Sequence, residues 1–265
     1  MTDTLHLLEK HFDTAFAAPD GVKKLRELIL TLAMQGKLIP QDPNDEPASE
    51  LLKKIEAEKQ RSIQEGKLKK AKPLPEIKPE EIPYDLPNGW QWIKFGDITI
   101  NRDGERVPIS KDDRLNMQGD YDYYGASGVI DKVNNYLFDK DLLLVGEDGA
   151  NLISRSTPIA FIAKGKYWVN NHAHVIDAYN FDLLRYLEKY INAINLEPYV
   201  TGTAQPKMNQ AKMNSILVAF PPLAEQKRIV EKIDRLMDLC DRLEQHLEAA
   251  THQQTRLLEA VVALV

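Results

Sequence analysis

The amino-acid sequence predicts an α+β protein, in which one mixed α/β domain is combined with long helices that form an antiparallel coiled coil. Three observations predict it: helically spaced apolar residues in 1–72, short apolar runs separated by Gly, Asn and Asp in 90–221, and a heptad repeat in 222–265. A proline-rich linker over 73–89 separates the first two regions.

The composition is that of an ordinary globular protein. The 265 residues are 43% hydrophobic and 28% charged, which excludes the disordered class. No apolar run approaches the roughly 20 residues of a membrane helix and no secretory signal follows Met1, so we expect a cytoplasmic protein with no membrane partner. A single cysteine, Cys240, excludes an intrachain disulfide framework and a cysteine-rich zinc site. The net charge of −6 counts against a protein that binds nucleic acid by charge alone.

Region 1–72 is expected to be helical. A first helix is indicated by the spacing of Leu5, Leu8, Phe12, Ala15 and Phe16. A second helix is expected over 22–34, with Gly36 as the residue that ends it. Ser49 is placed to cap a third helix that continues towards Lys70, and the outer face of that helix is rich in Lys and Glu, which is typical of a solvated surface.

The linker over 73–89 repeats proline every two to four residues, at Pro73, Pro75, Pro79, Pro83 and Pro87. Such a segment is extended and semi-rigid, so it predicts a spacer. A turn is indicated at 87–89, where the mixed domain begins.

Region 90–221 alternates strand-like runs with turn residues. Strands are expected over 90–95, 121–130, 142–145, 159–162, 167–169 and 174–176, and one helix over 181–194. Residues 90–220 contain 14 Lys and Arg against 16 Asp and Glu. A DNA-binding face in this region would therefore depend on how the charges are distributed rather than on an excess of cations.

Region 222–265 carries an apolar seam with alternating spacings of four and three residues. The seam comprises Ile229, Ile233, Leu236, Cys240, Leu243, Leu247, Ala250, Gln254, Leu257, Val261 and Leu264. This pattern predicts a coiled-coil helix, roughly 60 Å long at about 1.5 Å per residue. The seam needs a partner helix, which either the N-terminal helices or a second copy of the chain supplies.

The search for catalytic motifs is mostly negative. No phosphate-binding glycine loop is present, and the run 146–149 is too short and too acidic to act as one. Pro221-Pro222 predicts a rigid start to the coiled-coil helix. His172 and His174 would share one face of a strand, as a metal pair requires, but no third ligand has a recognisable spacing. A hydrogen-bonded or DNA-facing histidine pair is favoured, so we expect neither catalytic residues nor a metal site.

Several motifs, taken together and in order, resemble the specificity subunit of type I restriction-modification enzymes. Two of them are the run 202–209 (GTAQPKMN) and the segment 216–229, which contains PPLAEQ. Similar stretches are 24–54, 86–90 (LPNGW), 123–128 (YYGASG), 143–151 (LLVGEDGAN) and 170–175 (NNHAHV). The resemblance covers almost the whole chain.

The resemblance implies a target recognition domain that binds double-stranded DNA and is joined to spacer helices. Members of the family perform no chemistry and bind no cofactor themselves. They dock modification subunits, which methylate adenine with S-adenosylmethionine, and restriction subunits complete the enzyme. Full-length members have two recognition domains, whereas this chain has one. It is therefore either a half-subunit that forms a homodimer, or pairs with a second half-subunit, or a fragment.

The resemblance also indicates where DNA contacts are expected. Candidate base-reading residues are Tyr123, Tyr124, Ser127, Asn170, Asn171, His172, His174, Gln205 and Asn209. Candidate phosphate or guanine contacts are Arg102, Arg106, Arg155, Lys164, Lys166 and Lys207. Two alternatives stay open: a coiled-coil scaffold or decoy that binds modification subunits and alters their specificity, and a metal hydrolase that uses His172 and His174.

Overall fold

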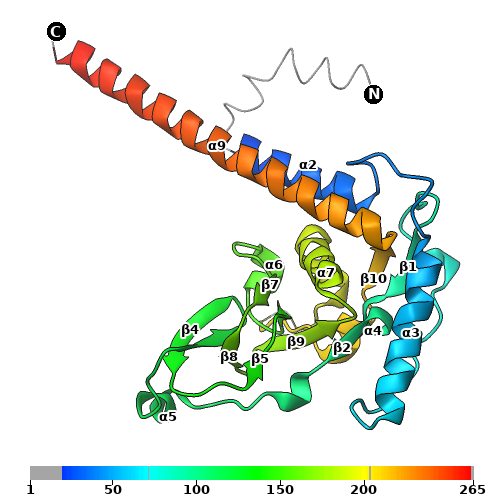
Figure 1. Ribbon diagram of the computed structural model, residues 1–265. Coiled ribbons are helices and arrows are strands. Elements are labelled where there is room, and N and C mark those ends of the chain that lie inside the picture. Colours follow the sequence, from blue (N-terminus) through cyan, green and yellow to red (C-terminus); the bar gives the residue numbers. More distant parts are fainter. Residues whose placement is uncertain (1–19, 71, 203, 264–265) are drawn as a thin grey trace.

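The computed structural model describes residues 20–70, 72–202 and 204–263. An α/β domain lies beneath a long C-terminal helix that crosses over it and extends beyond it (Figure 1). The helix predicted from Leu5 to Phe16 lies outside the described residues. No helix in the described part of the chain is both long enough and apolar enough to cross a lipid bilayer.

In the described part of the chain, two α-helices precede the domain. α2 (Gly21–Met34) confirms the second predicted helix, and Gly36 follows it with a φ of 65°. A Cβ at Gly36 would lie 2.4 Å from Cγ of Pro87, so the close approach of the linker also requires glycine here. α3 (Ala48–Gln64) begins after Pro47, which places Ser49 inside the first turn. The prediction that Ser49 caps this helix is therefore wrong.

The proline-rich linker is mostly exposed, but it is bonded to the rest of the protein at Tyr84. It contains one short 3₁₀ helix, η1 (Pro79–Glu81). The hydroxyl of Tyr84 donates a hydrogen bond to the carbonyl oxygen of Met34 at 2.9 Å, and Trp92 donates from its indole to the carbonyl of Tyr84 at 3.2 Å. These bonds fix the end of α2 to the start of the domain.

The described residues of the domain form three sheets. The strands are β1 (Gln91–Lys94), β2 (Thr99–Asn101), β3 (Tyr121–Gly125), β4 (Gly128–Val133), β5 (Phe138–Asp139), β6 (Leu142–Gly146), β7 (Ala160–Ala163), β8 (Lys166–Val169), β9 (Ala173–Ala178) and β10 (Leu217–Phe220). Two four-stranded sheets have the orders β2-β9-β6-β7 and β4-β3-β8-β5, and β1 pairs with β10. The predicted run 121–130 is a hairpin rather than one strand, because Gly125 and Gly128 flank a turn between β3 and β4.

The sheet β2-β9-β6-β7 is buried on both faces. On one face, Leu143 and Val145 of β6 pack with residues of α7 (Phe181–Ala193). On the other face, Leu142 and Leu144 pack with residues of the second four-stranded sheet. The burial of both faces explains why the sequence of β6 is a continuous apolar run instead of an alternating one.

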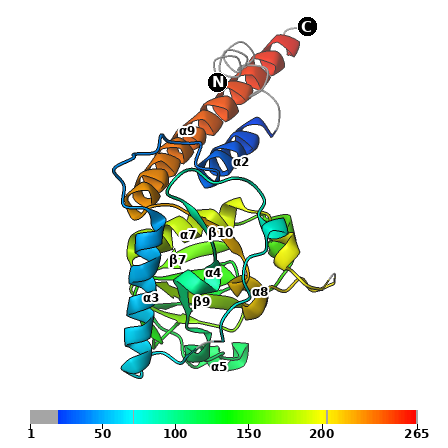
Figure 2. The same ribbon diagram turned by 90° about the vertical axis from the view of Figure 1, so that its right-hand side faces the viewer.

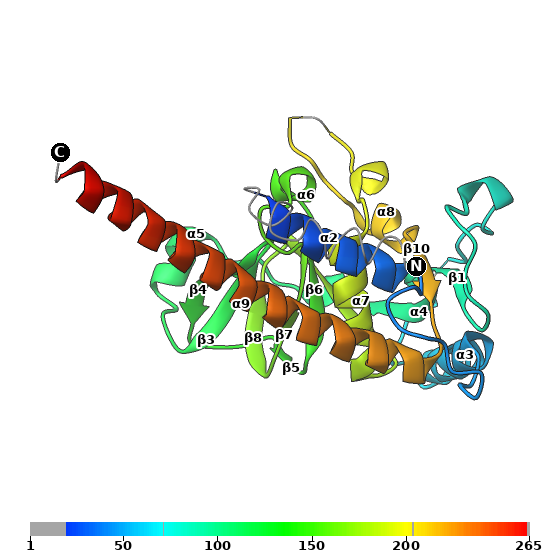
Figure 3. The same cartoon turned by 90° about the horizontal axis from the view of Figure 1, so that it is seen from above.

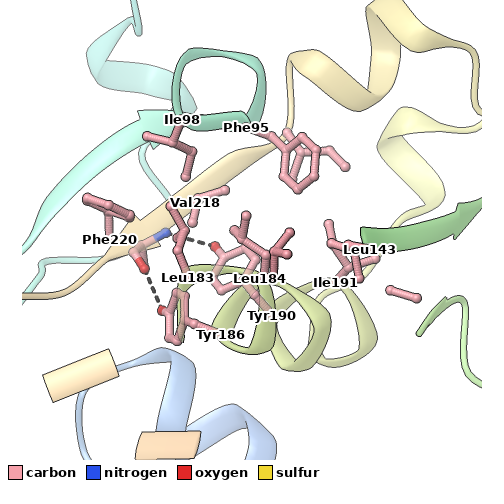
Figure 4. Packing of buried hydrophobic residues seen from close by; sticks show 14 of the residues in the cluster. Phe95, Ile98, Leu143, Leu183, Leu184, Tyr186, Tyr190, Ile191, Val218 and Phe220 are labelled. Atoms are coloured by element: carbon pink, nitrogen blue, oxygen red, sulfur yellow. Dashed lines mark hydrogen bonds between the residues drawn. The ribbon is translucent and has the colours of Figure 1, made fainter. Parts of the chain in front are cut away.

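α7 also holds the C-terminal strand of the domain. The hydroxyl of Tyr186 donates to the carbonyl oxygen of Ala219 at 2.6 Å, and that of Tyr190 accepts from the amide of Ala219 at 3.1 Å (Figure 4). The hydroxyl of Tyr190 also donates to the carbonyl oxygen of Leu217 at 2.9 Å. β10 pairs with β1 in antiparallel register from Gln91 opposite Phe220 to Lys94 opposite Leu217. The two ends of the domain are therefore joined side by side.

α9 (Leu223–Val262) confirms the predicted long helix. It starts directly after Pro221-Pro222, and the buried carboxylate of Glu225 fixes this junction by accepting a hydrogen bond from the indole of Trp90 at 2.8 Å. α2 lies antiparallel to α9 (Figures 1 and 3). Arg26 of α2 forms ion pairs with Asp241 and Glu244 of α9 at 2.6 and 2.7 Å.

The two halves of the α9 seam have different surroundings. Ile229, Ile233 and Cys240 are buried, and Leu236, Leu243 and Leu247 pack with α2 residues around Val22 and Ile29. Leu257 and Val261 are 67% and 62% exposed among the described residues. Only the first half of the predicted seam is thus packed within the described part of the chain.

Candidate functional site

Four segments that are far apart in the sequence meet at one edge of the two larger sheets. They are the β3–β4 turn, residues 147–149 after β6, the β8–β9 turn at 170–172, and the described part of loop 201–209 (residues 201–202 and 204–209), which projects from the domain (Figures 2 and 3). Three of the sequence motifs, 143–151, 170–175 and 202–209, thereby form one surface.

Backbone hydrogen bonds hold these segments together. The amide of Glu147 donates to the carbonyl of His172 at 2.8 Å, and the amide of Met208 donates to the carbonyl of Glu147 at 2.8 Å. The amide of Gly149 donates to Pro206 at 3.0 Å. A Cβ at Gly146 would lie 2.9 Å from the carbonyl oxygen of Ala126, so the β3–β4 turn reaches the edge only because this position is glycine.

Six of the sequence-predicted DNA contacts are exposed on this edge. They are Ser127, Asn171, His172, Gln205, Lys207 and Asn209. Amide, hydroxyl and imidazole groups of this kind can hydrogen-bond to base edges, and a lysine can contact phosphate. Part of this set is already engaged, because Asn209 accepts the amide of Lys212 at 3.0 Å as the cap of the short helix α8 (Gln210–Asn214).

A buried charge network lies beneath the exposed edge. His174 is 1% exposed, and its Nδ1 lies 2.6 Å from a carboxylate oxygen of Asp103, while its Nε2 lies 2.8 Å from the carbonyl oxygen of Met208. Both neighbours can only accept hydrogen bonds, so both ring nitrogens must donate, which requires the protonated imidazolium. His174 therefore carries a positive charge that joins β9 to the 3₁₀ helix η2 (Asp103–Glu105) and to loop 201–209.

Glu147 extends the same network. Its carboxylate accepts from Nη1 of Arg106 at 2.9 Å and lies 3.0 Å from Nζ of Lys207 and 3.7 Å from Nδ1 of His174. Arg106 also donates to the carbonyl oxygen of Ala173 at 2.7 Å. The network consequently links loop 201–209, through Lys207, to the buried ends of β6 and β9.

The network shifts the pKa values of its members. Burial would lower the pKa of His174, but its hydrogen bond to Asp103, the charge of that carboxylate and the Met208 carbonyl raise the pKa above 6.5. Burial would raise the pKa values of Asp103 and Glu147, but the hydrogen bonds from His174 to Asp103 and from Arg106 and Lys207 to Glu147 lower them.

We expect the thermal stability of the protein to fall as the pH rises through neutrality. A group whose pKa is raised on folding stabilises the folded state below its unfolded pKa, here 6.5, and this contribution is lost as the pH rises through the folded value. The pKa values of Asp103 and Glu147 are lowered on folding, so these two carboxylates lose their contribution to stability only as the pH falls into the acid range. The unfolding midpoint should therefore decline more between mildly acidic and mildly alkaline pH in the wild type than in His174→Gln. Parallel profiles for the two proteins would contradict a charged His174.

The cluster of Asp103, Glu147 and His174 contains side chains of the types that bind metal ions. Oxygen and nitrogen atoms of Asp103, Glu147 and His174 lie within 4.8 Å of one another. Each of these groups already has a protein partner, and both nitrogens of His174 point at acceptors, so a metal would first have to displace a proton and an ion pair. The arrangement fits a charge network better than a ligand set.

The two histidines of the predicted pair do not act together. The Nδ1 of His172 lies 2.8 Å from a carboxylate oxygen of Asp148 on the surface, whereas His174 binds Asp103 in the interior. Within the described ranges His172 belongs to no group of three or more ligand-capable side chains. The geometry therefore gives no support to a hydrolase that uses both histidines.

Several candidate DNA contacts have side chains that are engaged within the fold. Arg102 pairs with Asp177 at 2.7 Å, and Arg106 is committed to the network described above. Arg155 donates to the last carbonyls of α7, including Ile191 and Asn192 at 2.9 Å, and so caps that helix.

The aromatic and amide candidates at the ends of β3 and β8 are likewise engaged within the fold. Tyr123 is 1% exposed, and its hydroxyl bonds with the backbone of Ile109. Tyr124 packs against Phe161 and Tyr167. Asn170 is buried, and its side-chain oxygen accepts the amide of His172, which shapes the β8–β9 turn. His174 is equally inaccessible.

Lys164 and Lys166 are exposed but lie away from the edge. They flank the turn between β7 and β8, where Ala163 pairs with Leu142 at the start of β6 rather than at its end. Lys166 lies over the ring of Tyr136, 4.7 Å from its centroid.

Sequence patterns did not single out Asp103, Glu147 and Asp148 as functional residues. Each of these carboxylates stands directly before or within an Asp-Gly turn, and such turns are also common where a residue has no function beyond the turn itself.

Comparisons with known proteins agree on one family. Residues 87–251 match the family described as Type I restriction modification DNA specificity domain. The chain is 35% identical over 262 residues to the Type I restriction enzyme EcoEI specificity subunit of Escherichia coli, covering 92% of this chain and 44% of that protein. It is 31% identical over 275 residues to the EcoAI specificity subunit of the same species, covering 96% and 46%. The chain thus spans less than half the length of these relatives.

Solved structures show the same fold. One is the crystal structure of the type I restriction-modification system S subunit from M. genitalium, with a TM-score of 0.51 and 14% identity over 97% of this chain and 58% of that one. Another comes from work on complex assembly and conformational transition of the type I R-M system, with a TM-score of 0.54 and 17% identity over 91% and 56%.

Proposed function

Because the chain belongs to the type I restriction modification DNA specificity domain family, we propose that it is a specificity subunit that reads one half of a bipartite site in double-stranded DNA. The observation that carries the proposal is the meeting of four distant segments in one exposed polar edge, supported by a rigid charge network. Base readout needs polar side chains on a scaffold of fixed geometry, and backbone hydrogen bonds join the segments that carry this edge.

The proposal assigns no reaction to this chain. Methyl transfer from S-adenosylmethionine to adenine would belong to partner modification subunits, and DNA cleavage to restriction subunits. The described residues contribute a charge network whose members are already paired, which suits positioning rather than proton transfer. Since the substrate of such an assembly is DNA, the proposal places the chain in the cytoplasm.

The proposal includes a homodimer. The distal part of α9 exposes Leu257, Leu258, Val261 and Val262 in the described part of the chain. An apolar helix face of this kind is typical of a helix–helix interface, and a two-fold pairing buries the same face of both copies. A symmetric dimer would carry two recognition domains, so its site would be a split palindrome.

Methylome sequencing tests the proposal. The full chain is co-expressed with its cognate modification subunit in cells that lack other adenine methyltransferases. We expect methylated adenine in a symmetric split palindrome. An asymmetric bipartite site would overturn the homodimer, since it requires a different second half. Absence of methylation with both proteins soluble and associated would overturn DNA recognition and favour a decoy.

A further inference from the structure

A second surface, rich in cations, lies beside the recognition edge. It is a groove of about 520 Å³ between the end of α3 and the elements β2, η2 and α8. Its lining includes five basic residues, Lys59, Lys67, Lys69, Lys70 and Arg102, against one acidic residue, Glu105. In a chain with a net charge of −6, this is a strong local segregation of positive charge.

The basic side chains of the groove differ in whether they already form ion pairs with acidic residues of the protein. Glu105 is neutralised by Arg102 at 2.9 Å, and Arg102 also binds Asp177. Lys67 lies 2.6 Å from the exposed Glu65. Lys69 and Lys70 are exposed, and neither forms an ion pair with the described residues. They come from the run 66–72 (GKLKKAK), which has four lysines and no acidic residue.

The lysine run is held in place on both sides. Nζ of Lys59 donates to the carbonyl oxygens of Gly96 and Asp97 at 3.0 and 2.7 Å, which fixes α3 on the short helix α4 (Phe95–Ile98). After the run, Leu74 packs against Gly96, where a Cβ would lie 3.1 Å from its Cδ1. Figure 2 shows α4 between α3 and α8. Lys67, Lys69 and Lys70 follow the end of α3 and line the groove.

We infer that this groove binds the sugar-phosphate backbone of the duplex whose bases are read by the exposed edge. Phosphate contacts in protein–DNA complexes come from Lys and Arg together with amide side chains, and Asn101, Gln210 and Asn214 supply amides in the groove. The groove also adjoins the edge directly. Gln210 follows Asn209, and η2 contributes Glu105 to the groove and Asp103 to the network of His174.

The position of the groove favours DNA over a partner protein. The groove lies where the end of α3 meets the recognition domain, next to the loops that would read bases, whereas the exposed apolar face lies on distal α9. No aromatic residue lines the groove, whereas aromatic side chains are enriched in protein interfaces. The inference rests on the proposed function and adds to it the part of the chain that fixes the duplex in register.

The test measures DNA binding by the full chain in complex with its modification subunit. Fluorescence anisotropy with a labelled duplex of arbitrary sequence, and with one that contains the methylated site, is recorded over a range of KCl concentrations. The variant Lys67→Ala/Lys69→Ala/Lys70→Ala removes the exposed cations. The control Lys23→Ala/Lys53→Ala/Lys227→Ala removes the same charge from exposed lysines outside the groove. A Lys→Arg triple at 67, 69 and 70 retains the charge.

We expect the groove variant to bind both duplexes more weakly, by about tenfold near 0.1 M salt for each phosphate that a lysine no longer neutralises. The slope of log affinity against log salt should fall by about one for each such phosphate, while the ratio between target and arbitrary duplex stays unchanged. The arginine triple and the control should bind like the wild type. By contrast, Gln205→Ala on the edge should reduce that ratio.

Failure of the groove inference and failure of the proposed function give different results in this test. A groove variant that binds DNA like its control would overturn the groove as a phosphate site and leave the proposed function intact. A groove variant that no longer associates with the modification subunit would also overturn it, because the lysines would then form a protein interface. Failure of the wild-type complex to bind any duplex would overturn the proposed function itself.

Discussion

Leu257→Asp should dissociate the proposed homodimer and leave the chain folded, whereas Ile233→Asp should destabilise the fold itself. Both residues belong to one heptad seam, but Leu257 is 67% exposed and Ile233 is fully buried. An aspartate at position 257 stays in water in the monomer but would be buried against the partner helix in the dimer. At about 2 kcal/mol per copy, the two substitutions together weaken association by roughly a thousandfold.

An aspartate at position 233 would be buried and could not reach water. A buried carboxylate without a partner costs about 4 kcal/mol or more, a large part of the roughly 5–15 kcal/mol that stabilises a domain. Sedimentation equilibrium and thermal unfolding separate the two effects. A Leu257→Asp protein that remains dimeric would place the dimer interface elsewhere. An Ile233→Asp protein with wild-type stability would contradict the packing of α9 on the domain.

Asp103→Ala should lower the free energy of unfolding by about 3–5 kcal/mol. The substitution removes the carboxylate that lies 2.6 Å from His174 and that also accepts the amide of Val175 at 2.8 Å. It leaves a buried imidazolium with one acceptor fewer, so His174 must either stay charged at high cost or release its proton.

Asp103→Asn is the matched control, because it keeps the shape and the amide acceptor but removes the charge. We expect a smaller loss than for alanine. Chemical denaturation at mildly acidic pH, where wild-type His174 is fully charged, gives both values. If the alanine variant were as stable as the wild type, the charge network would not support the recognition edge.

Much of the fold could be predicted from the sequence, because its periodic signals are strong. The heptad of α9, the amphipathic pattern of α7 and the apolar run of β6 are confirmed. The family resemblance is confirmed by the match over residues 87–251. β2 and β5 were missed because they have three and two residues, and in β2 the apolar Ile100 lies between polar residues.

The recognition edge was harder to predict, because burial decides which polar residues are available. The sequence places His172 and His174 on one face of a strand, yet one lies on the surface and the other in the core. Tyr123 and Arg155 resemble ligand-binding residues by type, and only the tertiary structure shows that one fills the core and the other caps α7. The network partners Asp103 and Glu147 are 44 positions apart, a pairing that no local pattern indicates.

The pairing of β1 with β10 has a consequence for how such proteins diversify. Gln91 and Phe220 are neighbours across the ladder, so the chain leaves the helical scaffold and returns to it at adjacent points. The polypeptide between them is topologically an insertion. A different reading module with the same two bordering strands would fit the same scaffold as an interchangeable cassette. Target choice can then change without altering the distance that separates two such cassettes in an assembly.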